Sequence, residues 1–93
     1  MIVAVMTINL YLPGCGSLKE KRMILRSIKD KVSKKFNVSI AEVDYNDKWQ
    51  RSQIGIAQVG NDYGFLGSCM TNIFNLIDTN AQAEIVDHSV EYL

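Results

Sequence analysis

The sequence predicts an α+β fold, a ferredoxin-like β-α-β-β-α-β sandwich in which two helices cover one face of a four-stranded antiparallel sheet. Two segments place apolar residues at helical spacing, and four show the alternation that is typical of strands. Their order allows two right-handed crossovers. The chain has 93 residues, of which 47% are hydrophobic, so we expect a single domain over residues 1–93.

The first half of the chain is expected to form a strand and a helix. All even positions from Ile2 to Leu12 are apolar, which indicates a strand with one buried face. Three turn-forming residues end it, namely Pro13, Gly14 and Gly16. Ser17 and Glu20 form a capping box that begins a helix reaching about Phe36. The apolar stripe of this helix consists of Leu18, Leu25, Ile28 and Val32, with Ile24 at its edge.

The second half predicts three strands and a second helix. The strand from Phe36 to about Tyr45 changes its apolar positions from even to odd, which requires a bulge or a bend. After a polar turn, the third strand covers roughly Arg51 to Val59. A helix then starts near Asp62, with an apolar stripe made of Leu66, Met70, Ile73 and Ile77. The fourth strand covers Ala81 to Leu93.

Such a sheet has one face without helices. That face receives the odd positions of the first strand, among them Val3, Val5, Thr7 and Tyr11. They are too apolar for a fully solvated face, and contiguous apolar surface on a small domain marks an interaction site. One expectation is therefore a structural or protein-interaction module that forms a homodimer through this open sheet face.

The charge distribution is strongly one-sided. Ten basic and ten acidic residues give a formal net charge of zero. Eight of the basic residues lie between Lys19 and Lys35, and none follows Arg51. Residues 17–35 therefore carry a local charge of +6, whereas residues 61–93 carry five acidic side chains and no basic one. The first helix is thus the main candidate for contact with a polyanion.

Four cations form a row along this helix. At 100° per residue they fall within about 80° of one another, beside the apolar stripe. They are Lys19, Arg22, Arg26 and Lys29. Such a row matches a phosphate backbone, and binding of this kind weakens steeply as the salt concentration rises. A solvated helix face that only aids solubility is the alternative interpretation.

Residues outside this row extend or border the candidate surface. The turn before the third strand adds Lys48, Trp49 and Arg51 to the predicted phosphate-binding set. Trp49 either stands exposed as an anchor or packs over the end of the sheet. Lys21 lies closer to the apolar stripe, and we expect its ammonium group to reach outward to water.

No set of residues points to a reaction. Cys15 lies in a glycine-rich loop before the first helix, so an anion- or thiol-handling enzyme is a further alternative. A cysteine-based phosphatase loop would place five residues between Cys15 and an arginine, but six residues separate Cys15 from Arg22. Glu42 and Asp44 lack further metal ligands, and His88 is expected to be structural. We expect no enzyme activity, no catalytic residue, no metal, no cofactor and no small-molecule substrate.

Composition also predicts where the protein resides. The stretch from Met1 to Leu12 lacks a basic leader and is shorter than the about 20 residues that cross a bilayer. Cys15 and Cys69 lie 54 positions apart without metal-ligand spacing, so we expect two reduced thiols. These features predict a soluble, cytoplasmic protein with no membrane partner.

Four segments carry a resemblance that covers nearly the whole chain. They are Leu12-Pro13-Gly14, Ser17-Leu18-Lys19-Glu20-Lys21-Arg22, the stretch FNVSIAEV at residues 36–43, and Trp49-Gln50. Together they resemble the YlxP-like family of small bacterial proteins of unknown function. The resemblance implies a ferredoxin-like fold and a cytoplasmic bacterial protein, and it implies no known reaction. Genes of this family often lie beside translation and ribosome-maturation genes, so it also implies rRNA or a ribosomal subunit as a partner, by association only.

Overall fold

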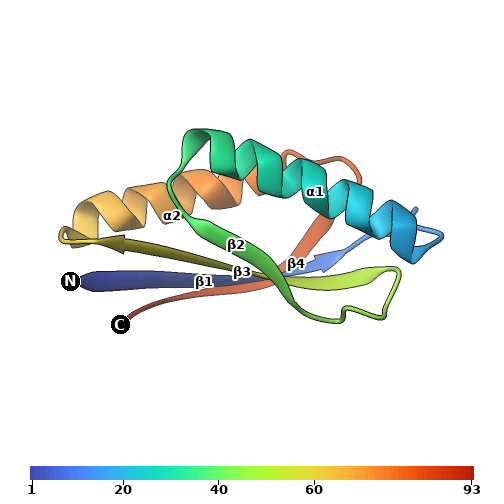
Figure 1. Cartoon of the computed structure of the whole chain (residues 1–93), viewed down its shortest axis with the longest axis horizontal. Coiled ribbons are helices and arrows are strands. Elements are labelled where there is room, and N and C mark those ends of the chain that lie inside the picture. The colour runs from blue at the N-terminus through green and yellow to red at the C-terminus, as the bar shows by residue number, and fades with distance from the viewer.

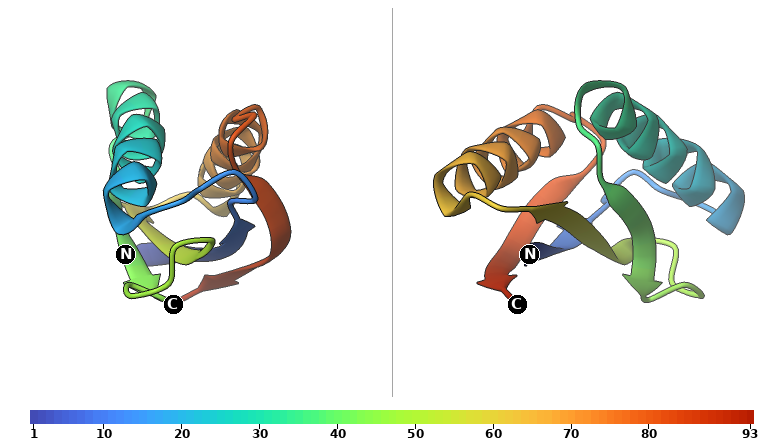
Figure 2. Two further views of the ribbon diagram at one scale, coloured as in Figure 1. Left: turned by 90° about the vertical axis from the view of Figure 1, so that its right-hand side faces the viewer. Right: turned by 60° about the vertical axis from the view of Figure 1, so that its left-hand side comes forward.

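The computed structural model describes all 93 residues and has the predicted order of elements (Figure 1). The elements are β1 (Ile2–Tyr11), α1 (Leu18–Lys35), β2 (Ser39–Asp44), β3 (Arg51–Gly60), α2 (Tyr63–Asp78) and β4 (Glu84–Tyr92). The strands form one antiparallel sheet in the order β2-β3-β1-β4. Both helices lie on the same face of this sheet (Figure 2). The predicted α+β, ferredoxin-like architecture is confirmed.

The core lies between the helices and the sheet. The even positions of β1 face the helices, and from Ala4 to Leu10 they are almost completely buried, as predicted from their alternation. They meet the apolar stripes of α1 and α2 in a cluster of 17 buried residues, which includes Ile28 of α1 and Ile73 of α2. Each fully buried aliphatic side chain of this size contributes about 1.5–3 kcal/mol relative to an exposed one. Core packing therefore determines which residues stand on the inner faces of the helices.

Both helices begin at the caps that the sequence indicates. The Ser17 hydroxyl accepts a hydrogen bond from the backbone N–H of Glu20 at 3.1 Å. The Glu20 carboxylate in turn accepts from the backbone N–H of Gly16 at 2.8 Å. Asp62 caps α2 by accepting from the N–H of Phe65 at 3.1 Å. Unpaired N–H groups of the first helical turn are thereby satisfied within the chain.

Two bulges shape the edge strands. The register of β2 against β3 shifts between Glu42 and Asp44, which confirms the predicted bulge. The extra residue, Val43, covers Gly55, where a Cβ atom would lie only 2.9 Å from a Val43 methyl group. A second bulge, not predicted, leaves Val86 of β4 without a partner on β1. Because of this bulge, Val86 no longer shares the alternation of the residues that follow it.

Two strands start later than the sequence pattern predicts. β2 begins at Ser39, because Phe36 has an extended backbone and caps the end of α1, donating its N–H to the carbonyl of Val32. β4 begins at Glu84, because a turn after α2 occupies residues 80–83. The Asn80 carbonyl oxygen accepts there from the N–H of Ala83. In both places a cap or a turn forms hydrogen bonds with backbone N–H and C=O groups that would otherwise pair with a neighbouring strand.

The sheet face away from the helices is mixed in character. Val3 and Val5 are half-buried and lie at one end of it, as expected. Its middle is crossed by side-chain hydrogen bonds between strands, with Asn9 contacting Asp87 on β4 and Gln53 on β3. These bonds satisfy polar groups without a second layer of structure. Neither helix combines the length and the apolar character needed to cross a bilayer.

Candidate nucleic-acid interface

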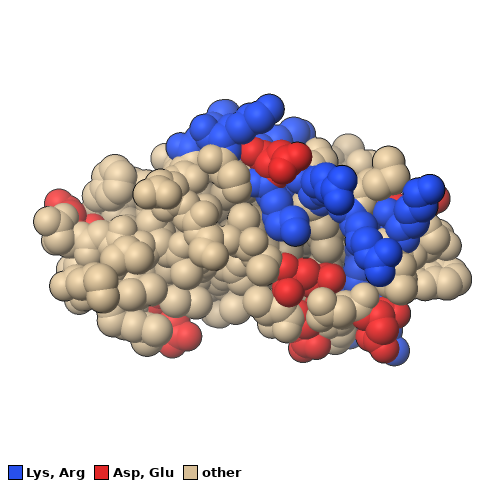
Figure 3. Space-filling model, in the orientation of Figure 1, with Lys and Arg blue, Asp and Glu red and all other residues tan.

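The four cations predicted on α1 stand on the side of the helix that faces away from α2. Lys19, Arg22 and Arg26 are exposed, and Lys29 is half-buried. The other flank of α1 faces α2, since Ile28, Lys31 and Val32 line one crevice with residues of α2. Figure 3 shows basic side chains gathered in a row over α1. At 1.5 Å per residue the four positions extend about 15 Å along the helix. We call Lys19, Arg22, Arg26 and Lys29 the basic ridge.

The basic ridge is not neutralised by carboxylates of the same chain. The one ion pair within 4 Å joins Lys21 to Glu42, and it uses none of the four ridge residues. The acidic groups of β4, such as Glu84 and Glu91, belong to the strand at the far edge of the sheet from β2. The cations therefore keep their charge available to an external partner.

Lys21 does not reach outward to water, and that prediction was wrong. Its side chain is 1% exposed and its ammonium group lies 2.9 Å from a Glu42 carboxylate oxygen. The ammonium also donates to the Tyr45 carbonyl at 2.7 Å and to the Arg51 carbonyl at 3.3 Å. The Ser52 hydroxyl donates to the same Glu42 oxygen at 2.7 Å. The cluster satisfies a buried charge, as burial of an ammonium group requires.

Two features of the sequence indicate this cluster, although the prediction for Lys21 did not use them. On the helical wheel Lys21 lies between Leu25 and Ile28, in the middle of the buried stripe. Ser52 shares its parity with the inward-facing Ile54 and Ile56 of β3. Inward-facing polar residues on neighbouring elements are expected to pair with one another.

The cluster and a glutamine together fix the turn that joins β2 to β3. Lys21 holds two of its carbonyl oxygens, those of Tyr45 and Asn46, from the helix side. From the other side, Gln50 donates its amide N–H groups to the carbonyls of Pro13 and Cys15 at 3.3 Å. The segment after β2 is thereby attached to the first turns of α1 and to the loop before it.

The turn carries the remaining residues of the predicted set. Trp49 is 55% exposed, so of the two expectations for this ring the exposed one is confirmed. The Arg51 guanidinium lies 4.3 Å from the centre of the Tyr45 ring and donates to its hydroxyl at 3.3 Å. Tyr45 itself has a positive φ of 63°, a left-handed conformation that a bulky residue adopts at a cost. Lys48 is exposed beside Trp49.

The ridge has an acidic border. Figure 3 shows acidic side chains below the row of cations and also a patch of acidic atoms among the cations at its upper end. β2 and the following turn contain Glu42, Asp44 and Asp47. Glu42 is paired with Lys21, and Asp44 accepts from the N–H of Tyr45 at 2.7 Å. Negative charge therefore borders the ridge on the side of β2.

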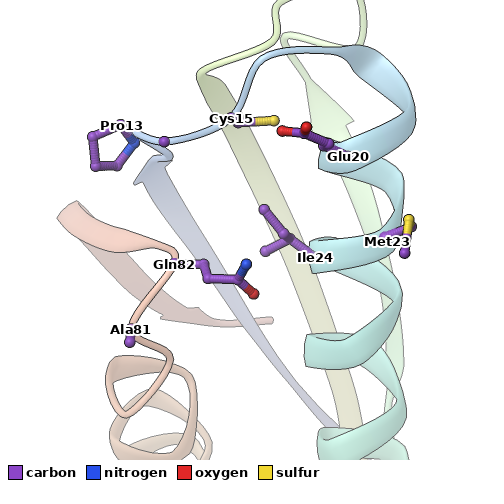
Figure 4. Close-up of a pocket in the computed structure, with 8 residues that line it drawn as sticks. Pro13, Cys15, Glu20, Met23, Ile24, Ala81 and Gln82 are labelled. Carbon is purple, nitrogen blue, oxygen red and sulfur yellow. The ribbon is translucent and has the colours of Figure 1, made fainter.

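The loop before α1 is already satisfied by the chain itself. Cys15 is 2% exposed and its thiol donates to the Ser17 carbonyl at 3.2 Å. The Glu20 carboxylate occupies the Gly16 N–H that a bound anion would use. A cavity of about 430 Å³ opens beside them between the start of α1 and the α2–β4 connection (Figure 4). Cys15 and Glu20 both line this cavity and face each other (Figure 4), but the hydrogen bonds of the thiol and of the carboxylate go to the backbone of Ser17 and Gly16.

The other chemical candidates lie apart from this surface. The bulge at Val43 separates Glu42 from Asp44, so the two carboxylates no longer follow a simple alternation. His88 lies on the helix-facing side of β4, opposite Ile8, with its ring 4.4 Å from that of Phe74. His88 is nevertheless exposed, so its ring contact with Phe74 is the interaction that the structure shows for it, and Val86, at the bulge, does not share this side.

The fold and the site together define a small ferredoxin-like domain with a basic helix flank and a tethered turn. Residues 3–90 match DUF503, a family described as a protein of unknown function, and the chain belongs to that family. The uncharacterized protein YlxP of Bacillus subtilis (strain 168) is 56% identical over 46 residues. That alignment covers 50% of this chain and 50% of YlxP, so it spans about half the length of the relative. The resemblance carried by the sequence motifs is confirmed.

Solved structures with the same fold have unrelated sequences. SnoaB, a cofactor-independent oxygenase from Streptomyces nogalater, superposes with a TM-score of 0.63 at 7% identity, over 98% of this chain and 92% of its own. The de novo designed protein Foldit4 gives 0.57 at 12% identity, over 100% and 97%. At these identities the likeness concerns the fold alone. An oxygenase and a designed protein share it, so the fold does not select a function.

Proposed function

We propose that this protein is a non-enzymatic binding module that associates with RNA or ribosomal particles in the cytoplasm. In this proposal the basic ridge of α1 contacts successive phosphates, and Lys48, Trp49 and Arg51 assist from the turn before β3. The family assignment leaves the biochemical role open, and the support for this role comes from the charged surface of α1 and the turn before β3.

One observation carries the proposal. The four ridge cations have no carboxylate partner within 4 Å, while the only basic residue of the chain that is fully buried, Lys21, is paired. A ridge that served stability would be expected to form ion pairs along the helix surface. Four unpaired cations in a row of about 15 Å instead match the spacing of several phosphates along one strand.

The proposal predicts a strong dependence on salt. Each phosphate neutralised on a single strand contributes about −0.7 to the slope of log affinity against log salt, so four contacts give about −3. Fluorescence anisotropy with labelled rRNA fragments at 50 to 200 mM salt measures this slope. Sedimentation with ribosomal subunits over the same range of salt concentration tests association with the ribosomal particle. No salt-sensitive association with either ligand at low ionic strength contradicts the proposal.

A matched pair of variants separates ridge contacts from general charge. Arg22→Glu combined with Arg26→Glu reverses two ridge cations and should abolish measurable binding at 150 mM salt. Lys34→Glu combined with Lys35→Glu makes the same charge change at exposed positions outside the ridge. If both pairs weaken binding equally, the ridge has no special role and the solvated-face alternative holds.

An observation on the open sheet face favours a second candidate, a dimerising interaction module. Val59 pairs with Val3 on this face and is exposed, and Leu93, hydrogen-bonded to Val3, is exposed beside them. Association through such a patch would not require the ridge. Mass in solution by light scattering tests it, and Val59→Glu should shift a dimer to a monomer. A monomer at all concentrations removes this candidate.

A further inference from the structure

We infer that the ligand of this surface is an unpaired, single-stranded nucleic-acid segment, one base of which stacks on Trp49. The inference rests on the proposed function, because it assumes that the ridge binds a phosphate backbone. It adds the structural class of the ligand, which the ridge alone does not determine. A row of cations attracts duplex and single strands alike.

Trp49 is exposed on a segment whose backbone is held in place, which is the combination that a stacking platform needs. Large aromatic side chains bury most of their area in cores, yet this ring is 55% exposed. Its neighbours are fixed, since Gln50 donates to the carbonyls of Pro13 and Cys15. The carbonyl of Gln50 also accepts from the N–H of Leu12 at 2.9 Å. A ring on a fixed backbone loses little conformational entropy when a base binds.

The surroundings of the ring suit a nucleotide. Trp49 lines an open hollow of about 390 Å³, and the other lining residues are Asp47, Lys48, Gln50 and Arg51. Lys48 and Arg51 can donate to a phosphate or to the edge of a base, and Gln50 contributes a side-chain amide. Asp47 is the one anion there, and it would accept from exocyclic amino groups while repelling phosphate.

The platform lies at one end of the basic ridge. Lys21 connects them, because it is part of the first turns of α1 while its ammonium holds the carbonyls of Tyr45, Asn46 and Arg51. On the helix Lys21 lies within two residues of Lys19 and Arg22, the first two ridge cations. A strand whose phosphates follow the ridge towards the start of α1 can therefore reach the turn that carries Trp49.

Base stacking distinguishes an unpaired strand from a duplex. Bases inside a duplex are already stacked, and side chains cannot reach them through the narrow major groove of A-form RNA. Unpaired bases stack readily on exposed aromatic rings next to a basic track. A duplex can contact the ridge but cannot stack a base on Trp49, whereas a single strand can do both.

The protein contains a single tryptophan, so its own fluorescence reports the contact. The probes are a 12-nucleotide single-stranded RNA, the same sequence as single-stranded DNA, and a 12-base-pair RNA duplex, each at 50 mM salt. Binding of the single strand should quench Trp49 emission, and binding of the duplex should not. Trp49→Ala should weaken single-strand binding about tenfold and leave duplex binding unchanged. Trp49→Phe should retain most of the affinity, since a ring remains.

The outcomes separate this inference from the proposed function. If Arg22→Glu with Arg26→Glu abolishes binding while Trp49→Ala changes nothing and emission is constant, the inference is overturned and the proposed function stands. If Trp49→Ala weakens duplex and single-strand binding equally, the inference is also overturned. If no nucleic acid binds the wild-type protein, both fail. Equal affinity for the RNA and DNA strands supports stacking without a contact to the 2′-hydroxyl. A higher affinity for the RNA strand identifies RNA as the ligand.

Discussion

The two helices lie side by side on the same sheet face, yet their outer sides differ almost completely. Each begins at a side-chain cap and buries five residues. α1 contains eight of the ten basic residues of the chain, whereas α2 contains none. α2 instead exposes uncharged and aromatic side chains, such as Tyr63 and Phe65. Since the core requires only the inner faces, the charges on the outer side of α1 are not part of the core.

One residue departs from this division between the two sides. Lys21 is a basic residue on the inner face of α1, and it holds the β2–β3 turn. α2 has no such residue on its inner face. The comparison can therefore be tested by substitutions that change one helix and leave the other intact.

The largest effect is expected from Lys21→Met. This change removes the only cation paired with the partly buried Glu42 carboxylate, which keeps the Ser52 hydroxyl alone, and it removes a donor from the carbonyls of the turn, so the free energy of unfolding should fall by about 3–5 kcal/mol. Urea unfolding followed by circular dichroism measures it. Lys31→Met, an exposed change on the same helix, should stay within about 0.5 kcal/mol. A loss below about 1 kcal/mol for Lys21→Met would show that the cluster does not hold the turn.

Equal effects are expected from truncating the two apolar stripes. Ile28→Ala in α1 and Ile73→Ala in α2 each remove a fully buried side chain, so each should cost about 3 kcal/mol. Thermal and urea unfolding of both variants provide the comparison. RNA affinity, measured well below the melting temperature, should be unchanged in both. A much smaller cost in α1 would mean that this helix depends on its charges as well as on its core.

Smaller effects are expected at the two helix caps. Asp62→Ala should lower the free energy of unfolding by about 1 kcal/mol, seen as a melting temperature about 4–8 °C lower. Ser17→Ala should cost less, because the Glu20 carboxylate still accepts from the N–H of Gly16. Differential scanning calorimetry of the two variants ranks them. The reverse order would indicate that Glu20 does not support the start of α1.

The smallest effect on stability, and the sharpest on function, should come from moving charge between the helices. Arg22→Gln and Arg26→Gln, combined with Asn72→Lys and Asn75→Lys, keep the net charge while transferring two cations to exposed positions of α2. Stability should change by less than about 0.5 kcal/mol per site. RNA affinity should not be recovered, because α2 lacks the tethered turn. Recovery in an anisotropy assay would show that only net charge matters.

Much of the fold was predictable because its signals are local. Caps at Ser17 and Asp62 and the alternation of β1 each act over a few residues, so the sequence displays them directly. The ridge was also predictable, since helical geometry alone brings Lys19 and Lys29 to one flank. The bulge in β2 was visible because its apolar parity changes within one strand.

The missed features depend on contacts between distant segments. The helical wheel places Lys21 on the inner side of α1, but its partners Glu42 and Ser52 come from β2 and β3, and no local pattern predicts that the three residues meet. The bulge at Val86 depends on how β4 pairs with β1, at the other end of the chain. Predicting either one requires the register between strands, which the alternation within a single strand does not provide.

Because Lys21 is buried, the rate at which its amine reacts reports how often one end of the molecule opens. An amine-directed acylating reagent reacts with a lysine only when its nitrogen reaches water, and of the seven lysines Lys21 is the one that does not. Its labelling must wait until the β2–β3 turn lifts from α1. Mass spectrometry of Lys21 acylation over time would therefore report how often the turn detaches, and labelling faster than global unfolding would show that it detaches from a folded domain.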